Sequence, residues 1–333
     1  MPVTSAILAF AVTLAVMPVL IVGLSRVGVL DHPNVRSSHD HPTLRGGGLA
    51  LAAGALIAAA VGSDITGSPR HALFIAVGLF GLLGLFDDLF TVPALNRLGL
   101  QSLIASLTLP PLLSGITGPA LWQLVFAAGV FVWLVGFVNV CNFMDGINGI
   151  AVAQAIVAGT VFALIGRARD LDAVAAGGAI IGAAALAFAP FNFPKARVFL
   201  GDVGSYALGA WLAVLVVLGL RAGVAFEALF APLAIFGTDA SLTLVRRVAR
   251  GATWYEPHRE HTYQRLVGQG WSHARTTGLA VVLMAACAAL GTVSLHPGAA
   301  ARVLADALIV VLVGAYLVAP SALQRRGHEP IAA

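Results

Sequence analysis

Acidic and amide side chains gather in several short polar runs of an otherwise apolar chain, and these runs are where chemistry is expected. One run contains Asn142, Asp145 and Asn148, and another contains the adjacent carboxylates Asp87 and Asp88. Carboxylate and amide oxygens are the ligands that a hard cation such as Mg²⁺ prefers. Polar groups beside lipid are costly unless they have a partner. The runs therefore predict that a polar ligand binds where the apolar segments end.

The pair Asp87 and Asp88 predicts either a cation ligand or a general base. Repulsion raises the pKa of one member of a carboxylate pair, and a cation or a basic loop relieves that repulsion. The pair stands at the C-terminal end of an expected helix, where the helix dipole disfavours anions. Neighbouring side chains on a helix point about 100° apart, so the two carboxylates are not expected to share one role. Ordinary solvated end charges are the alternative.

Asn142, Asp145 and Asn148 are spaced by three residues. If the segment is helical, these side chains line one face. From that face they could read the edge of a nucleobase or ligate a hard cation through oxygen.

Asp202 lies between Gly201 and Gly204, at the start of another apolar segment. The glycines would let a ligand approach the backbone. The alternative is that Asp202 is an N-cap residue of the helix that follows.

Two basic loops complete the polar set. His258, Arg259 and His261 lie beside aromatic residues in the longest polar loop, a composition that fits a phosphate-binding lid. A zinc site is the weaker alternative, because the His-x-x-His spacing has no cysteine near it. In the loop Asp31–Gly48, Arg45 precedes three glycines. A helix that starts on glycines could turn free N–H groups toward an anion, although the loop could also be an ordinary basic connection.

The composition indicates which elements must position these residues. The chain is 59% hydrophobic and only 10% charged, and its mean hydropathy is +0.92. These values are typical of a polytopic integral membrane protein of the all-α class. Since one span needs about 20 residues, the charge-free stretches predict about eleven transmembrane helices. The stretch Leu98–Met144 must fold back once, with its turn at Pro110-Pro111 and Ser114–Pro119. The expected spans are Met1–Ser25, Gly46–Ser63, His71–Phe86, two within Leu98–Met144, Gly146–Gly166, Ala173–Pro194, Val203–Leu220, Ala228–Val245, Thr276–Ala301 and Ala307–Gln324.

The distribution of the 19 lysines and arginines predicts the topology. Most of them fall in the connections after the odd-numbered spans, which places those connections in the cytoplasm, the N-terminus outside and the C-terminus in the cytoplasm. Because the basic residues are spread over six loops, no nucleic-acid partner is expected. We expect one domain, residues 1–333, whose active site is formed by the cytoplasmic loops 26–45, 87–100, 139–148, 191–203 and 246–275.

The placement of the polar residues also separates classes of membrane protein. A secondary transporter is expected to hold polar groups near the middle of the bilayer, often in broken helices of an internal repeat. Here the polar groups collect at one interface, and no clear repeat is visible. This pattern favours an enzyme that brings a soluble substrate to a lipid, with a transporter as the alternative from another class.

Five segments, taken together, resemble the polyprenyl-phosphate N-acetylhexosamine-1-phosphate transferases of glycosyl transferase family 4. The likeness is closest to the bacterial enzymes that initiate O-antigen and common-antigen synthesis. It is weaker to the phospho-MurNAc-pentapeptide transferases, whose loop has three adjacent histidines where this chain reads His-Arg-Glu-His. Asn148 stands where many bacterial members have aspartate. The segments, in the order that the family has them, are Asp31–Gly48, Leu85–Asp88, Asn139–Gly149, Phe199–Ser205 and His258–Gln264.

The resemblance implies a reaction at a bacterial inner membrane, on its cytoplasmic face. Undecaprenyl phosphate would attack the β-phosphorus of a UDP-N-acetyl sugar, with Mg²⁺, or Mn²⁺ in its place, as the cofactor, and UMP would leave. Members of the family can be homodimers. The resemblance implies Asp202 and Asn142 as metal ligands, Asp87 or Asp88 as the group that deprotonates or positions the lipid phosphate, Asp145 and Asn148 as uridine contacts, His258, Arg259 and His261 as phosphate contacts, and Arg45 as a further part of the pocket.

Overall fold

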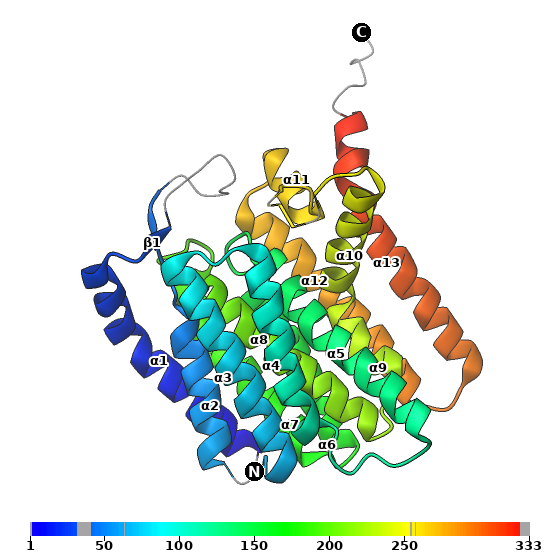
Figure 1. Cartoon of the computed structure of the whole chain (residues 1–333). Helices are drawn as coiled ribbons and strands as arrows, with labels where there is room; N and C mark the ends of the chain where they lie inside the picture. The colour runs from blue at the N-terminus through cyan, green and yellow to red at the C-terminus, as the bar shows by residue number, and fades with distance from the viewer. Residues whose placement is uncertain (1, 32–40, 63, 254, 257, 327–333) are drawn as a thin grey trace.

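The computed structural model describes residues 2–31, 41–62, 64–253, 255–256 and 258–326, and the described chain is a bundle of helices (Figure 1). The predicted all-α membrane class is confirmed. Short 3₁₀ turns at Ala231–Leu233 and Thr292–Leu295 join α9 to α10 and follow α12. The helices are α1 Pro2–Val27, α2 Gly48–Val61, α3 Gly67–Phe90, α4 Ala94–Leu112, α5 Ala120–Phe143, α6 Ile150–Ala168, α7 Asp172–Asn192, α8 Gly201–Arg221, α9 Phe226–Phe230, α10 Ala234–Ala249, α11 Thr262–Gly268, α12 His273–Gly291 and α13 Ala299–Arg326.

The expected spans coincide with helices, but not all of these helices are equally apolar. Among the described residues, nine segments are long and apolar enough to cross a membrane. The two other expected spans correspond to α2, which has only 14 residues, and to α4. The expected turn in Leu98–Met144 is found, but Pro110 and Pro111 lie in the last turn of α4 and the chain reverses over residues 113–119. Helices α1 and α13 begin and end, respectively, at opposite ends of the bundle (Figure 1).

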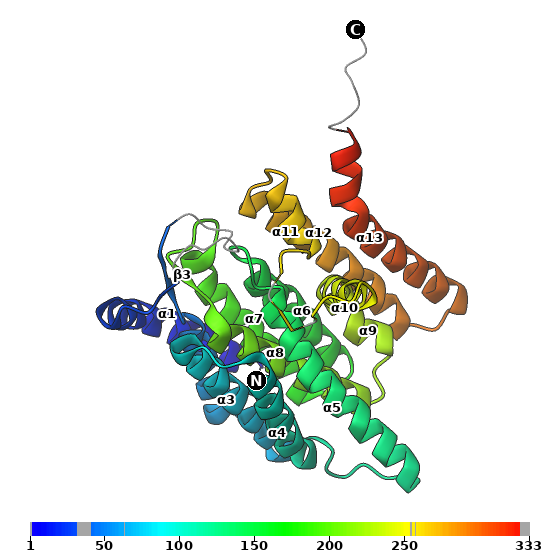
Figure 2. The ribbon, with the colours of Figure 1, turned by 45° about the horizontal axis from the view of Figure 1, so that its top comes forward.

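Helix α8 is the centre of the bundle. The most apolar stretch of α8 is 94% buried. The helix packs against α3, α5, α2 and α7. Figure 2 shows the neighbouring helices on its different sides. A helix that is apolar all round is expected to be enclosed in this way. Trp211 at its middle donates from Nε1 to the Gly177 carbonyl of α7, 2.9 Å away. The first turn of α8 is therefore held in a fixed place relative to the surrounding helix ends.

A small three-stranded sheet, which the sequence did not predict, lies at the polar end of the bundle. Strand β1 (Leu30–Asp31) pairs antiparallel with β2 (Thr43–Arg45), and β2 pairs parallel with β3 (Val198–Phe199), just before α8. Parallel pairing sets Arg45 opposite Phe199. The sheet therefore fixes Arg45 beside the start of α8. Of the expected loop Asp31–Gly48, residues 32–40 lie outside the described residues.

Gly47 and Gly48, two of the three glycines after Arg45, serve packing instead of presenting free N–H groups to an anion. The N–H of Gly47 donates to the Phe199 carbonyl at 2.9 Å, and the N–H of Gly48 donates to the Leu200 carbonyl at 2.8 Å. A Cβ at Gly48 would lie 2.2 Å from the Cα of Gly204. The expectation that these N–H groups turn toward a ligand is therefore wrong, because the segment before α8 uses them.

The other polar loops are shorter than the sequence suggested, because helices extend into them. Asp87 and Asp88 belong to the last turns of α3, and only residues 91–93 separate α3 from α4. Asn139 and Asn142 belong to α5. The polar residues thus sit on rigid helix ends, which positions their side chains more accurately than flexible loops would.

Replacing Gly84 by alanine is expected to lower the thermal stability of the protein. A Cβ at Gly84 would lie 2.3 Å from the Asp202 carbonyl oxygen and would push α3 away from α8. Overpacking of this kind costs about 1–3 kcal/mol. Thermal denaturation in detergent measures the effect. Gly78→Ala in the same helix is the matched control, since its Cβ would meet nothing within 4 Å; equal behaviour of the two variants would contradict the close contact.

Candidate active site

The site is centred on Asp202, in the first turn of α8. The Asn142 amide on α5 donates from Nδ2 to Asp202 Oδ1 at 2.8 Å and to the Ser205 hydroxyl at 3.1 Å. Arg45 on β2 donates from Nη2 to the same Asp202 oxygen at 2.9 Å. The structure thus brings together three predicted residues that are up to 157 positions apart in the sequence (202 − 45).

Asp88 joins α3 to the start of α8. Its Oδ1 accepts the N–H of Asp202 at 2.9 Å, and its Oδ2 accepts the N–H of Val203 at 3.0 Å. Arg45 Nε lies 2.6 Å from Oδ1, and the Asp88 side chain is only 1% exposed. Asp88 therefore satisfies N–H groups that would otherwise lack a partner at the start of this helix. The alternative that Asp202 is itself the N-cap is wrong, because the N-cap position is Leu200.

Asp87 has different partners from Asp88, as the expected divergence of their side chains requires. Its Oδ1 accepts the N–H of Val92 at 2.7 Å, and Arg97 Nη1 donates to Oδ2 at 2.6 Å. The Tyr206 hydroxyl on α8 lies 3.5 Å from the same oxygen. The Asp87 and Asp202 carboxylates also lie near each other. Asp87 thus faces the centre of the site, whereas Asp88 supports it.

Arg97 and Tyr206 are functional candidates that the sequence analysis missed. Arg97 is one of the basic residues whose distribution predicts the topology, and it is the first basic residue after the acidic pair. A buried carboxylate requires a partner, and this rule points to Arg97. Tyr206 gave no comparable signal, because an aromatic residue in an apolar helix is usually a packing residue.

The run after Asn142 does not form one helical face. Helix α5 ends at Phe143 and α6 begins at Ile150, so Asp145 and Asn148 lie in the turn between them. Burial raises the pKa of the Asp145 carboxyl well above its usual range, and the charge of Asp202 adds to this effect. Asp145 therefore belongs to the acidic cluster around Asp202.

Asn148 lies at the edge of the site and is tied to two other segments. Its Nδ2 donates to the Pro194 carbonyl at 3.1 Å, and its own carbonyl accepts the Thr277 hydroxyl of α12 at 2.9 Å. Next to it, the N–H of Gly149 donates to the side chain of buried Asn192 at 2.8 Å. In the present contacts the Asn148 amide thus holds the 193–198 connection in place.

The loop before α11 brings two histidines over the end of α5. The rings of His258 and His261 are 4.9 Å apart, and His261 stacks on Phe143 with a centroid distance of 6.3 Å. His258 Nδ1 accepts the N–H of Glu260, which leaves Nε2 to carry the ring proton. Burial, with the charges of His261 and Arg247, lowers the pKa of His258 to about 4. At neutral pH, His258 is therefore an uncharged ring that can donate a hydrogen bond from Nε2.

Asp239, a buried residue of α10, lies behind the His261 ring. The His261 ring is buried, with Nδ1 3.5 Å from Asp239 Oδ1. Asp239 also accepts the N–H of Thr262 and the Tyr316 hydroxyl. The Tyr263 hydroxyl donates to the Phe143 carbonyl at 2.9 Å and joins α11 to α5. Arg259, the third predicted residue of this loop, instead lines a pocket with arginines of α10 and α11.

No cage of protein ligands for a metal is present in the part of the chain that the structure describes. Among these residues there is no group of three or more His, Cys, Asp or Glu side chains placed to hold a metal ion. A Mg²⁺ ion in an enzyme of phosphate chemistry needs less, since one or two carboxylates plus water and substrate phosphates suffice. Asp202 receives both Arg45 and Asn142 on Oδ1, and Oδ2 takes part in neither of these contacts. The donor set therefore fits Mg²⁺ and offers no support for zinc.

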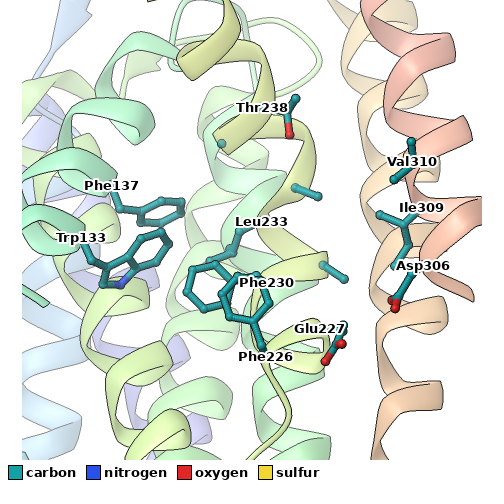
Figure 3. A pocket seen from close by; sticks show the side chains of 13 residues that line it. Trp133, Phe137, Phe226, Glu227, Phe230, Leu233, Thr238, Asp306, Ile309 and Val310 are labelled. Carbon is teal, nitrogen blue, oxygen red and sulfur yellow. The ribbon is translucent and has the colours of Figure 1, made fainter. Parts of the chain in front are cut away.

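An apolar pocket opens on the other flank of α5. It has a volume of about 350 Å³ and is lined by aromatic residues of α5 and α9 together with residues of α10 and α13. Figure 3 shows Trp133, Phe137, Phe230 and Leu233 together on one side of the pocket, with Ile309 and Val310 on the opposite side. The Trp133 ring is 4.7 Å from Phe137 and 4.8 Å from Phe230. A pocket of this character suits a hydrocarbon chain.

Curated relatives that resemble this chain carry names of lipid-phosphate transferases. A "Probable undecaprenyl-phosphate N-acetylglucosaminyl 1-phosphate transferase" of Bacillus subtilis is 27% identical, over 74% of this chain and 72% of its own. A decaprenyl-phosphate N-acetylglucosaminephosphotransferase of Mycolicibacterium smegmatis is 28% identical, over 86% and 81%. A phospho-N-acetylmuramoyl-pentapeptide-transferase of Staphylococcus haemolyticus is 29% identical, over 63% and 74%.

The family model described as glycosyl transferase family 4 matches residues 71–239. This range contains Asp87, Asp88, Asn142, Asp145 and Asp202, the acidic cluster that the structure assembles. Since the match covers half of the chain, the protein belongs to glycosyl transferase family 4.

Proposed function

We propose that the protein transfers N-acetylglucosamine 1-phosphate, or a related N-acetylhexosamine 1-phosphate, from a UDP-sugar to undecaprenyl phosphate. An oxygen of the lipid phosphate attacks the β-phosphorus of the UDP-sugar. The bond between the β-phosphorus and the bridging oxygen breaks, and UMP leaves with that oxygen. The product is a lipid-linked diphosphosugar, the starting unit of a cell-envelope polysaccharide.

The observation that carries this proposal is the cluster of Asp87, Asp202, Asn142 and Arg45 at one end of a membrane bundle. The cluster joins carboxylates, which suit a cation, to a guanidinium, which suits a phosphate. A reaction between two anions needs both. The relatives named for N-acetylglucosamine 1-phosphate transfer also match a larger share of this chain than the pentapeptide transferases do.

We propose Mg²⁺, with Mn²⁺ as a substitute, as the cofactor that Asp202 and Asn142 would hold. When bound, this ion would neutralise the diphosphate oxygens and the departing UMP. The Asp87 carboxylate is buried, the Asp202 side chain is 14% exposed, and the two lie near each other; such a pair is relieved by a cation. Arg45 would contact a phosphate oxygen from the opposite side of Asp202.

The two adjacent aspartates would divide their roles. Asp87, next to Asp202 and Arg97, would face the lipid phosphate and position it. A phosphate monoester has its second pKa near 6 and is mostly a dianion at pH 7, so positioning matters more than proton removal. Asp88, whose oxygens are held by α8 and Arg45, would act as a positioning residue behind the site.

The remaining predicted residues would surround the nucleotide. Asp145 and Asn148, in the turn after α5, would lie beside the uridine. His258 would donate to a phosphate oxygen as a neutral ring, and buried His261 would do so through Nε2 while Asp239 orients its other nitrogen. The apolar pocket beside Trp133 would take part of the polyprenyl chain. We propose that this end of the bundle faces the cytoplasm of a bacterium and that the protein lies in the inner membrane.

A phospho-N-acetylmuramoyl-pentapeptide transferase activity is a candidate because such enzymes also match this chain. It is the second candidate because their matches cover a smaller share of the chain than those of the N-acetylglucosamine 1-phosphate transferases. The two candidates use the same lipid phosphate and the same leaving group. They differ in the sugar, so the sugar decides between them. A transporter has no support from the family.

The proposed reaction predicts that the purified protein, given Mg²⁺ and undecaprenyl phosphate, releases UMP from UDP-N-acetylglucosamine or a related UDP-N-acetyl sugar. UMP is measured by a coupled assay, and the lipid product by mass spectrometry. A panel that includes UDP-MurNAc-pentapeptide separates the two candidates. Folded protein that releases UMP from no sugar of the panel would refute the proposed function, and a pentapeptide preference would select the second candidate.

A further inference from the structure

A second basic pocket lies where α10, α11 and the loop between them meet. We call it the arginine pocket; it has a volume of about 630 Å³. Four guanidinium groups line it against a single carboxylate. The lining residues are Thr243, Arg246, Ala249, Arg250, Arg259, Glu260 and Arg265.

The one carboxylate of the arginine pocket is already neutralised. Arg247 Nη1 donates to Glu260 Oε1 at 2.9 Å, and Arg250 forms an ion pair with Glu260 Oε2. Arg247 is buried, so Glu260 has the additional task of balancing its charge. In the described part of the chain, the exposed Arg246 side chain has no hydrogen-bond or ion-pair partner. The pocket therefore carries an excess of positive charge that a phosphate group would complement, since guanidinium groups pair with phosphate oxygens in a bidentate manner.

The arginine pocket lies at the level where two candidate membrane spans end. Helix α10 closes the span Phe226–Ala249, and α13 closes the span Ala299–Gln324. Arg265 of α11 donates to the Ser321 hydroxyl of α13 at 3.0 Å. The last turns of α10 expose Val245 and Val248, as a surface in contact with lipid chains would. Figure 1 shows α10, α11 and α13 close to one another at this end of the bundle.

The arginine pocket is separate from the site around Asp202. None of its lining residues contacts Asp87, Asn142 or Asp202 among the described residues. The loop that carries Arg259 into the arginine pocket places His261 on Phe143, at the end of α5. Neighbouring residues of this loop therefore line two different sites: Arg259 and Glu260 line the arginine pocket, and His261 lies at the end of α5. A single substrate pocket does not explain this division.

We propose that the arginine pocket binds the phosphate headgroup of an anionic membrane phospholipid, whose acyl chains lie along the exposed apolar side chains of α10 and α13. A soluble phosphate could pair with the same guanidinium groups. The exposed Val245 and Val248, and the position of the pocket where two candidate membrane spans end, favour a lipid. This site goes beyond the proposed reaction and does not depend on it, because in the described part of the chain none of its lining residues contacts the cluster around Asp202.

The experiment is native mass spectrometry of the protein in detergent with phosphatidylglycerol or phosphatidylcholine added. The wild type is expected to retain phosphatidylglycerol in preference to phosphatidylcholine. The double variant R246Q/R250Q is expected to bind phosphatidylglycerol about 30-fold more weakly, which corresponds to about 1 kcal/mol for each arginine. R246K/R250K keeps the charge but not the planar guanidinium groups. Its affinity for phosphatidylglycerol is expected to lie between those of the wild type and R246Q/R250Q.

The matched control is R167Q/R169Q, which removes the same charge at the C-terminal end of α6, away from the arginine pocket. It is expected to keep the preference of the wild type. Thermal denaturation shows whether both variants are folded. If both are folded, equal phosphatidylglycerol binding by R246Q/R250Q and R167Q/R169Q would overturn the proposal. Displacement of the lipid by millimolar inorganic phosphate would also overturn it, in favour of a soluble anion. No displacement, with loss of binding only in R246Q/R250Q, supports the lipid.

Discussion

Replacing Asp202 by asparagine is expected to lower the rate of UMP release by about 10³-fold, which corresponds to about 4 kcal/mol of transition-state stabilisation. The substitution keeps the size of the side chain and an oxygen that can accept from Asn142. It removes the negative charge that faces Arg45 and Asp87. A cation held between carboxylates loses its main ligand when that charge is removed. The fold is expected to survive, because Asp88, not Asp202, caps α8.

The measurement is UMP release at saturating UDP-sugar, repeated over a range of Mg²⁺ concentrations. The proposed metal role requires that the Mg²⁺ dependence change together with the rate. Asp172→Asn is the matched control, since Asp172 is exposed in the first turn of α7, at the other end of the bundle, and should behave as the wild type. Turnover by Asp202→Asn with an unchanged Mg²⁺ dependence would remove Asp202 from the proposed metal site.

Much of the fold followed from composition, because a bilayer allows few solutions. Long charge-free stretches predict helices, and each expected span was found as helical structure, although α12 ends at Gly291 and not at Ala301, and α13 begins at Ala299 and not at Ala307. The short sheet was not predictable. Strands β1 and β3 have only two residues each, too few for an alternating pattern to be recognised. The pairing of β2 with β3 joins segments more than 150 positions apart (198 − 44 = 154), which a single sequence does not reveal.

The candidate site was predictable as a set of residues but not as a geometry. Asp202, Asn142 and Arg45 were selected by residue type and by their place at the ends of apolar segments, and the structure brings them together. The contacts of Asp88 with α8 were hidden, because a carboxylate that caps a helix of another segment has no local signature. The expected single face of Asn142, Asp145 and Asn148 failed because α5 ends at Phe143. The spacing of three was real, but the helix did not continue.

Replacing Asp88 by alanine is expected to destabilise the protein by about 3–5 kcal/mol, the usual cost of breaking a buried ion pair by removing one partner. The N–H groups of Asp202 and Val203 would lose their acceptor, and Arg45 would lose one of its two carboxylate partners. In thermal denaturation in detergent, the midpoint is expected to fall by about 5–10 °C. Asp88→Asn, which keeps one acceptor oxygen, is expected to lose less.

The comparison with Asp87 shows whether the two adjacent carboxylates have separate roles. Asp87→Asn keeps an oxygen for the N–H of Val92 and leaves the start of α8 untouched, so it is expected to lower turnover more than stability. Asp172→Ala, which removes an exposed carboxylate, is the control for the stability measurement. If Asp88→Ala abolished turnover without lowering the denaturation midpoint, Asp88 would act on the substrate and the division of roles would be wrong. If stability falls, the acidic pair is explained by its geometry: one carboxylate builds the helix start that carries Asp202, and its neighbour, a hundred degrees away on α3, faces the reacting phosphates.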